Sequence, residues 1–229
     1  DHCYAEAWDA RGLQGLPTRW GPHADRTRTK TWGNPIRWQK KARAEGVRYR
    51  VFCASLADVF DNHKSILQEW RRDLWALIKS CPDLDFLMLT KRPQNIIKML
   101  PDDWGDGYAN VWLGATVESQ KEADRLDHLT RVPAAVRFLS MEPLLGAVDL
   151  SKHIDKLHWV ITGGENHREY RKVDPDWFRV LRDQHAAANG PVQFKQWEGE
   201  GKKVSKAKRR ELDGVVHNGY PLGKLVGVV

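Results

Sequence analysis

The sequence HWVITGGE, residues 158–165, is a short apolar run that ends in polar and glycine residues. Such a run is typical of a strand that is covered on both faces and delivers a polar tip at its carboxyl end. Five other stretches show the same order, with apolar residues first and polar residues last: 50–55, 86–91, 111–116, 136–142 and, more weakly, 192–197. The sequence therefore predicts six strands.

The spacing of the strand ends indicates how the predicted strands are connected. The intervals between successive ends are 35, 26, 24, 22 and 33 residues, measured at Ser55, Thr90, Thr116, Ser140, Thr162 and Lys195. Each interval accommodates one crossover helix and is too long for a hairpin, which favours parallel β/α units. We therefore predict an α/β fold: a partial (β/α) barrel of the TIM type. We expect it to be truncated at its N-terminus, because no strand precedes the first loop.

Helical periodicity marks two of the crossover helices. Asp61 or Asn62 is expected to cap a helix with an apolar stripe over 66–78. Asp174 is expected to cap a second helix, which ends before Gly190. Residues 212–221 are expected to form a small hairpin or a loop.

The amino-acid composition indicates which class of protein this is. The chain has 229 residues, of which 41% are hydrophobic and 29% charged, values that are ordinary for a soluble globular domain. It has no apolar run long enough for a membrane span, no secretory signal, and three cysteines that form no disulfide framework. We therefore expect a cytoplasmic protein. Residues 1–200 are assigned to one barrel domain and residues 201–229 to a basic C-terminal tail.

The net charge of +7 is unevenly distributed. Residues 26–50 hold nine Lys or Arg against Glu45, and residues 195–210 hold seven against Glu198 and Glu200. Two basic segments on a mildly acidic body favour a nucleic-acid partner, while a solvated surface is the alternative. Trp32 and Trp38 lie in the first segment and suit either stacking on bases or burial. A protein partner is a further alternative to nucleic acid.

Three glutamates follow predicted strands and are candidate catalytic residues: Glu118, Glu142 and Glu165. Because parallel strands bring their carboxyl ends to one edge, these carboxylates are expected to share a rim. There they would accept hydrogen bonds from an amine or a ribose, or transfer protons.

Other polar or glycine residues at the same strand ends are candidates for binding a cofactor: Ser55, Asp58, Lys91, Gly163, Gly164 and Lys195. The two lysines offer positive charge to a carboxylate or a phosphate, or form salt bridges between loops. The paired glycines allow a ligand to approach the backbone, or a tight turn.

Cys3 stands at the start of a predicted short helix, where the helix dipole favours a thiolate or a metal ligand; a structural thiol is the alternative. Cys53 and Cys81 have no partner at metal-ligand spacing and are interpreted as small buried residues.

Several motifs together resemble one family. They are residues 3–6 (CYAE), 30–32 (KTW) with Pro35 and Trp38, 52–60 (FCASLADVF), 89–93 (LTKRP), 112–114 (WLG) with 117–118 (VE), 137–146 (RFLSMEPLLG), 163–165 (GGE) and 194–197 (FKQW). Spread over nearly the whole chain, they resemble the phage and prophage proteins of domain-of-unknown-function family 5131, also called the phage gene-product 37/68 proteins.

In that family the segment before Cys3 supplies two more cysteines, and the last pair has Cys-x-x-Cys spacing. This motif is similar to the cluster motif of radical S-adenosylmethionine enzymes, which also use a partial β/α barrel. The resemblance implies that Cys3 is the third ligand of a [4Fe–4S] cluster whose fourth iron binds S-adenosylmethionine. The sequence departs from this pattern twice. It lacks the other two cysteines, and its Gly-Gly-Glu follows a late strand instead of an early one.

These observations favour a radical S-adenosylmethionine-like enzyme that acts on nucleic acid or a modified nucleotide. Two alternatives stay open. One is a non-catalytic nucleic-acid or partner-binding protein on a barrel scaffold, for which the tryptophans and the basic segments matter most. The other is a cluster-free barrel enzyme that uses the rim carboxylates for acid–base chemistry. Fold alone does not separate them, because barrels support many chemistries.

Overall fold

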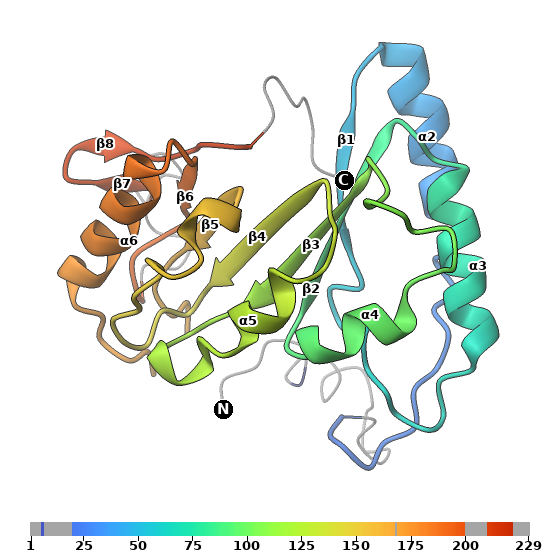
Figure 1. The fold of residues 1–229 in the computed structure, drawn as a ribbon, viewed down its shortest axis with the longest axis horizontal. Helices are drawn as coiled ribbons and strands as arrows, with labels where there is room; N and C mark the ends of the chain where they lie inside the picture. The colour runs from blue at the N-terminus through green and yellow to red at the C-terminus, as the bar shows by residue number, and fades with distance from the viewer. Residues whose placement is uncertain (1–5, 7–19, 168, 200–209, 222–229) are drawn as a thin grey trace.

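A six-stranded parallel sheet forms the centre of the computed structural model, which describes residues 6, 20–167, 169–199 and 210–221. The strands pair in sequence order and curl into a half-barrel (Figure 1). They are β1 Tyr49–Cys53, β2 Leu84–Thr90, β3 Val111–Thr116, β4 Val136–Met141, β5 Trp159–Thr162 and β6 Val192–Phe194. Each coincides with a predicted strand, which confirms the α/β class and the partial barrel.

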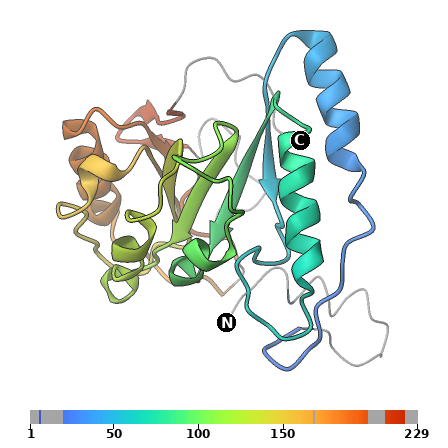
Figure 2. The same cartoon turned by 45° about the vertical axis from the view of Figure 1, so that its right-hand side comes forward.

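Helices connect most of the strands and cover the convex face of the sheet. Among the described residues they are α2 Asn34–Glu45, α3 Gln68–Lys79, η1 Pro93–Asn95, α4 Ile96–Met99, η2 Gln120–Glu122, α5 Arg125–Leu129, η3 Ile154–Lys156 and α6 Pro175–Ala187. Figure 2 brings α2 and α3 forward, side by side next to β1. The helix α6 lies at the other end of the sheet and contacts β6.

The prediction of the α6 helix is confirmed, and two other helix predictions are wrong. Asp174 caps α6 by accepting a hydrogen bond from the backbone nitrogen of Asp176. The connection between β4 and β5 contains only the short η3 in place of a crossover α-helix. The helix expected to begin after Asp61 begins at Gln68; the Asp61 carboxylate lies in the preceding loop, where it accepts hydrogen bonds from Arg26 at 2.9 Å and from the His63 nitrogen at 3.2 Å.

The two faces of the sheet bury separate sets of side chains. On the convex face, strand residues such as Met88, Leu113 and Leu139 pack against the helices in the main core. On the concave face a smaller cluster consists of Leu87, Trp112, Val136, Phe138 and Trp159. Successive strand residues alternate between these clusters, so both faces need apolar residues and the strands appear as continuous apolar runs.

Tyr220 joins the two sides of the curled sheet. Its ring lies 3.6 Å from the Arg50 guanidinium carbon on β1, and its centroid lies 5.1 Å from that of Trp159 on β5. Three strands separate β1 from β5 within the sheet, so one ring reaches both only because the sheet is strongly curled. The segment before Tyr220 is bonded to β6, where Gly219 donates to the Val192 carbonyl at 3.0 Å.

The predicted hairpin near the C-terminus is formed by β7 Glu211–Leu212 and β8 Val215–Val216. Leu212 is buried in the main core, and Asp213 forms ion pairs with Arg179 and Arg182 on α6. This hairpin therefore packs with the barrel, although it falls within the range assigned to the tail. Residues 200–209 and 222–229 lie outside the described residues. No helix in the described part of the chain is long and apolar enough to cross a membrane.

Gly114 on β3 leaves room for the Phe138 ring on the concave face. A Cβ atom at Gly114 would lie 2.4 to 2.6 Å from three ring atoms of Phe138. We expect Gly114→Ala to lower the free energy of unfolding by about 1–3 kcal/mol through overpacking. Urea denaturation measures this, with Gly33→Ala as the control because nothing lies within 4 Å of its added Cβ. Equal stability of the two variants would contradict the packing argument.

Because His185 is buried, we predict that the unfolding free energy of the protein depends on pH. The side chain is fully buried in α6, and neither ring nitrogen has a hydrogen-bond partner among the described residues. Burial lowers its pKa from 6.5 to about 4, with a smaller effect from His158. The unfolded chain therefore binds this proton near pH 6.5 while the folded protein does not. The unfolding free energy should fall by about 3 kcal/mol as the pH drops through this window. Urea titrations at several pH values should show a smaller loss for His185→Leu; identical profiles would contradict the assignment.

Candidate functional site

The carboxyl ends of the strands lie along one edge of the sheet, because all six strands run in the same direction (Figure 1). All the predicted site residues except Cys3 lie in the loops that follow these ends or directly beside them. Cys3 lies outside the described residues. We call this the carboxyl edge, and its side chains form the candidate site.

Glu118 follows β3 and is held by cations from two sides. Lys91, after β2, donates to Oε1 at 2.5 Å, and Arg125 on α5 donates to Oε2 at 3.0 Å. Arg125 also donates to the Thr116 carbonyl at 2.8 Å, which fixes its guanidinium at the end of β3. Glu118 is buried, whereas the Lys91 side chain is 62% exposed, so a ligand in solvent reaches the lysine first.

Glu142 follows β4 and is bound by the segment that follows β6. Lys195 donates to Oε2 at 2.5 Å, and Gln196 donates to Oε1. The Gln196 amide also donates to the Gly164 carbonyl at 2.9 Å. Gln196 is buried and therefore sets the position of both Glu142 and the turn after β5.

Glu165 follows β5 and forms a bidentate pair with Arg171. Nε and Nη2 of Arg171 donate to the two carboxylate oxygens at 3.0 and 2.6 Å, and the Arg171 backbone nitrogen donates at 2.9 Å. The hydrogen bonds to Glu165 raise the pKa of Arg171, and burial only partly opposes this. Bidentate pairs of this kind are among the strongest polar contacts in proteins, so Glu165 is firmly oriented.

The space beside Gly163 and Gly164 is filled by the chain itself. A Cβ atom at Gly164 would lie 2.4 Å from the backbone nitrogen of Glu198, and one at Gly163 would lie 3.0 Å from the Gln196 amide nitrogen. The Gly164 nitrogen donates to the Gln196 carbonyl at 2.8 Å. The two glycines thus allow residues 196–198 to cross the end of β5 in direct contact with it.

Asp58 links the loop after β1 to the loop after β2. One carboxylate oxygen accepts from the Phe60 nitrogen at 2.9 Å. The other accepts from the Thr90 hydroxyl at 2.9 Å, the Lys91 nitrogen at 3.2 Å and Arg92 at 3.1 Å. Asp58 thereby positions the backbone from which Lys91 reaches Glu118. Ser55 is exposed in the same loop and has an interaction within the protein.

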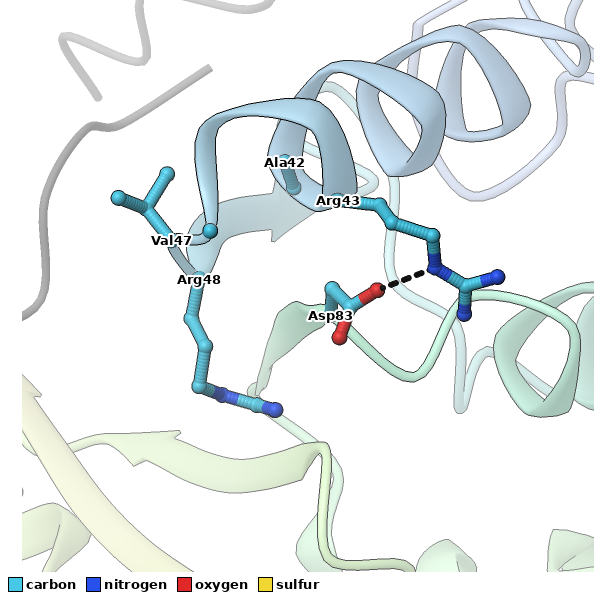
Figure 3. Close-up of a pocket in the computed structure, with 6 residues that line it drawn as sticks. Ala42, Arg43, Val47, Arg48 and Asp83 are labelled. Carbon is cyan, nitrogen blue, oxygen red and sulfur yellow. Dashed lines mark hydrogen bonds and ion pairs between the residues drawn. The ribbon is translucent and has the colours of Figure 1, made fainter.

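A cavity of about 580 Å³ opens beside Glu118 at the carboxyl edge. It is lined by Lys91, Gln94, Lys121, Glu122, Asp124, Arg125 and His128. A second pocket, of about 270 Å³, lies at the amino ends of β1 and β2 and contains the Arg43–Asp83 ion pair (Figure 3). Only the first shares residues with the predicted site.

Three of the side chains that hold the glutamates were not predicted from the sequence: Arg125, Arg171 and Gln196. Gln196 lies in the FKQW motif, which was a usable signal. Arg125 stands at the start of α5, seven residues after Glu118, and Arg171 lies in an irregular segment, six residues after Glu165; neither spacing predicts a contact.

The basic segment 26–50 is largely compensated by carboxylates. Five of its nine cations form ion pairs with carboxylates in the described part of the chain: Arg26–Asp61, Arg28–Asp73, Lys41–Glu45, Arg43–Asp83 and Arg48–Asp85. Trp38 packs against the main core, and Trp32 lies 3.9 Å from the Arg28 guanidinium carbon. The electrostatic attraction of this segment for a polyanion is therefore smaller than its sequence indicates.

Neither described cysteine resembles a metal ligand. Burial raises the pKa of the Cys53 thiol to about 12, and it also raises that of Cys81, which is fully buried. Both are therefore thiols at neutral pH, whereas metals bind thiolates. Among the described residues, no group of three His, Cys, Asp or Glu side chains is arranged to hold a metal ion.

Asp58 offers a direct test of how the carboxyl edge is positioned. Asp58→Ala leaves Thr90, the Lys91 amide and Arg92 without their shared acceptor, so we expect it to lower the unfolding free energy by about 2–3 kcal/mol. Urea denaturation measures the change beside Asp106→Ala, a substitution at an exposed position expected to have an effect within about 0.5 kcal/mol. A comparably small effect of Asp58→Ala would contradict the positioning role.

Comparison with known proteins identifies one family. Residues 1–221 match the family described as protein of unknown function (DUF5131). No curated protein and no solved structure shows a significant match to the chain. The match covers nearly the whole sequence, including every strand and every residue of the candidate site. The chain therefore belongs to the DUF5131 family.

Proposed function

We propose that the protein is a radical S-adenosylmethionine-like enzyme with a [4Fe–4S] cluster, that it acts on nucleic acid or a modified nucleotide, and that the carboxyl edge is its active site. The observation that carries the proposal is that Glu118, Glu142 and Glu165 follow three neighbouring strands, and that each is oriented by a fixed partner. Parallel barrels place their chemistry at this edge. The cluster itself rests on the resemblance around Cys3.

The described residues do not themselves fit a cluster. Cys53, which is half-buried, and Cys81, which is buried, both have raised thiol pKa values, so they do not replace the missing thiolate ligands. The resemblance assigns one ligand to Cys3 and the other two to cysteines upstream of it, neither of which is in this sequence. Cluster binding therefore depends on residues outside the described part of the chain, and the carboxyl edge contributes the surrounding polar groups.

The lysines of the carboxyl edge suit an anionic substrate. Lys91 and Lys195 each neutralise one buried or half-buried carboxylate, while their own side chains are 62% and 41% exposed. A phosphate that binds either lysine competes with its carboxylate partner. Glu118 retains Arg125 and Glu142 retains Gln196, so both keep their orientation when a lysine turns to the ligand. The released oxygen then accepts a hydrogen bond or a proton from the substrate.

The same carboxylates support a second candidate, a cluster-free barrel enzyme that acts on a small phosphorylated substrate. The cavity beside Glu118 favours it, because Lys91, Lys121 and Arg125 line a space of about 580 Å³ next to a candidate base. In this case Cys3 has no part in the activity. A non-catalytic nucleic-acid-binding protein receives less support, because the carboxylates of the protein already pair with most of the cations in residues 26–50.

The iron and sulfide content of a chain extended upstream of Asp1 separates these candidates. After anaerobic reconstitution we expect about four irons per chain, because the proposed cluster contains four. Cys3→Ala should lose most of the iron, since it removes one of the three ligands. Cys53→Ala is the matched control and should retain it, because the Cys53 thiol has a pKa of about 12. Absence of iron from all three proteins would reject the cluster and favour the cluster-free enzyme.

A further inference from the structure

Phe52 is an exposed aromatic side chain in a sheet where the other large apolar side chains of the six described strands are buried or half-buried. It is 42% exposed, whereas Leu87, its partner in the β1–β2 register, is 6% exposed. Val51 lies in the main core and Cys53 packs against it, so Phe52 between them points to the concave face. Leu87 belongs to the concave cluster, in agreement with this direction. The concave face therefore presents an uncovered aromatic ring.

The exposure is confined to the carboxyl end of β1. The first three residues of this strand are buried, Phe52 is exposed and Cys53 is half-buried, whereas β3 is buried throughout. The ring thus lies where β1 reaches the carboxyl edge, at one side of the proposed active site. An aromatic ring in water gains free energy when a partner covers it, so this position suits a ligand that brings an apolar face.

The turn that follows Phe52 is fixed by the protein itself. Ala54 has a φ of 58°, a left-handed conformation that is uncommon for alanine, and its carbonyl accepts a hydrogen bond from the Ala57 nitrogen at 2.9 Å. Asp58 then ties the loop to the Thr90 hydroxyl at 2.9 Å. Backbone strain of this kind clusters at functional sites, where the surroundings hold it in place. The surroundings of the ring are therefore preformed, and a ligand has little chain to order when it binds.

Cations stand on the strand next to the ring. Lys91 and Arg92 follow β2, and their side chains are 62% and 38% exposed. Lys91 lies four residues beyond Leu87, the register partner of Phe52, which corresponds to about 13 Å of extended chain. Proteins that bind single-stranded nucleic acid combine an aromatic ring, on which a base stacks, with cations that hold the phosphates. The β1 end of the carboxyl edge has both components.

We propose that Phe52 is a stacking platform for a base of a single-stranded nucleic acid, and that Lys91 binds a phosphate of the same strand. This role depends on the proposed function, since the base belongs to the nucleic-acid substrate. The base covers the ring on its open side. Stacking tolerates any sequence, because every base has a π-face. The platform therefore positions the substrate beside the Lys91–Glu118 pair without selecting its sequence.

Photochemical cross-linking tests contact with the ring itself. A single-stranded oligouridine that carries 5-iodouracil is irradiated with the full chain, and the cross-linked peptides are identified by mass spectrometry. We expect the cross-link at Phe52, and Phe52→Leu should remove it. This readout uses the wild-type protein, so it does not depend on the folding of a variant. Cross-linking only at other aromatic residues, such as Trp32, or no cross-link at all, would overturn the proposal.

Fluorescence anisotropy of the same oligonucleotide measures how much the ring contributes to affinity. Phe52→Leu should bind about fivefold to a hundredfold more weakly, whereas Phe52→Tyr keeps the π-face and should bind as the wild type does. Val216→Ala is the matched control, because Val216 is 43% exposed on the hairpin beside α6 and should not affect binding. Lys91→Ala should weaken binding and lower the slope of log K against log salt by about 1.

The binding results also separate failure of the platform from failure of the proposed function. If the wild type binds the oligonucleotide and Phe52→Leu binds it equally well, the platform is rejected and the nucleic-acid substrate stands. If the wild type does not bind it, the platform and the nucleic-acid substrate are both rejected. The iron content of the extended chain is measured independently and is changed by neither result.

Discussion

Pairing of carboxylates with cations at the carboxyl edge is the interaction on which the candidate site depends. Parallel strands bring Asp58, Glu118, Glu142 and Glu165 to one edge, where four partly buried negative charges would repel one another. Each is matched by a Lys or Arg. Two of these partners come from the loop after β2 and one from the segment after β6. The pairs thus neutralise the edge and connect loops that are distant in sequence.

The strands were predictable because most of their residues are buried on both faces and they are therefore apolar runs; Phe52 near the end of β1 is the exposed exception among the large apolar strand residues of the sheet. The residues of the carboxyl edge followed from this, since the polar tip of a parallel strand has a fixed place. The start of α3 was not predictable, because Asp61 accepts a cap-like hydrogen bond from the His63 nitrogen and yet lies in a loop that it also ties to Arg26. The contacts of Arg125, at the start of α5, and of Arg171, in the loop after β5, depend on how the connections fold over the edge, and no sequence period encodes that geometry.

The two ends of the half-barrel differ in chemistry. At the carboxyl edge donors and acceptors are matched, and a ligand must compete with internal ion pairs. At the amino end the donors of Arg50, Trp112 and Trp159 exceed the acceptors. The concave face between them is filled by the cluster around Phe138, for which Gly114 leaves room.

The segment that carries Tyr220 also limits how the sheet can grow. Backbone groups of residues 217–219 bond to Val192 and Phe194, so the outer edge of β6 is already covered. Among the described residues, β1 pairs with β2 and with no second strand. Unpaired strand edges are where further strands add, whether from the same chain or from another. Extension of this sheet is therefore one-sided: β6 is closed to a new strand, and β1 has the edge at which one can join.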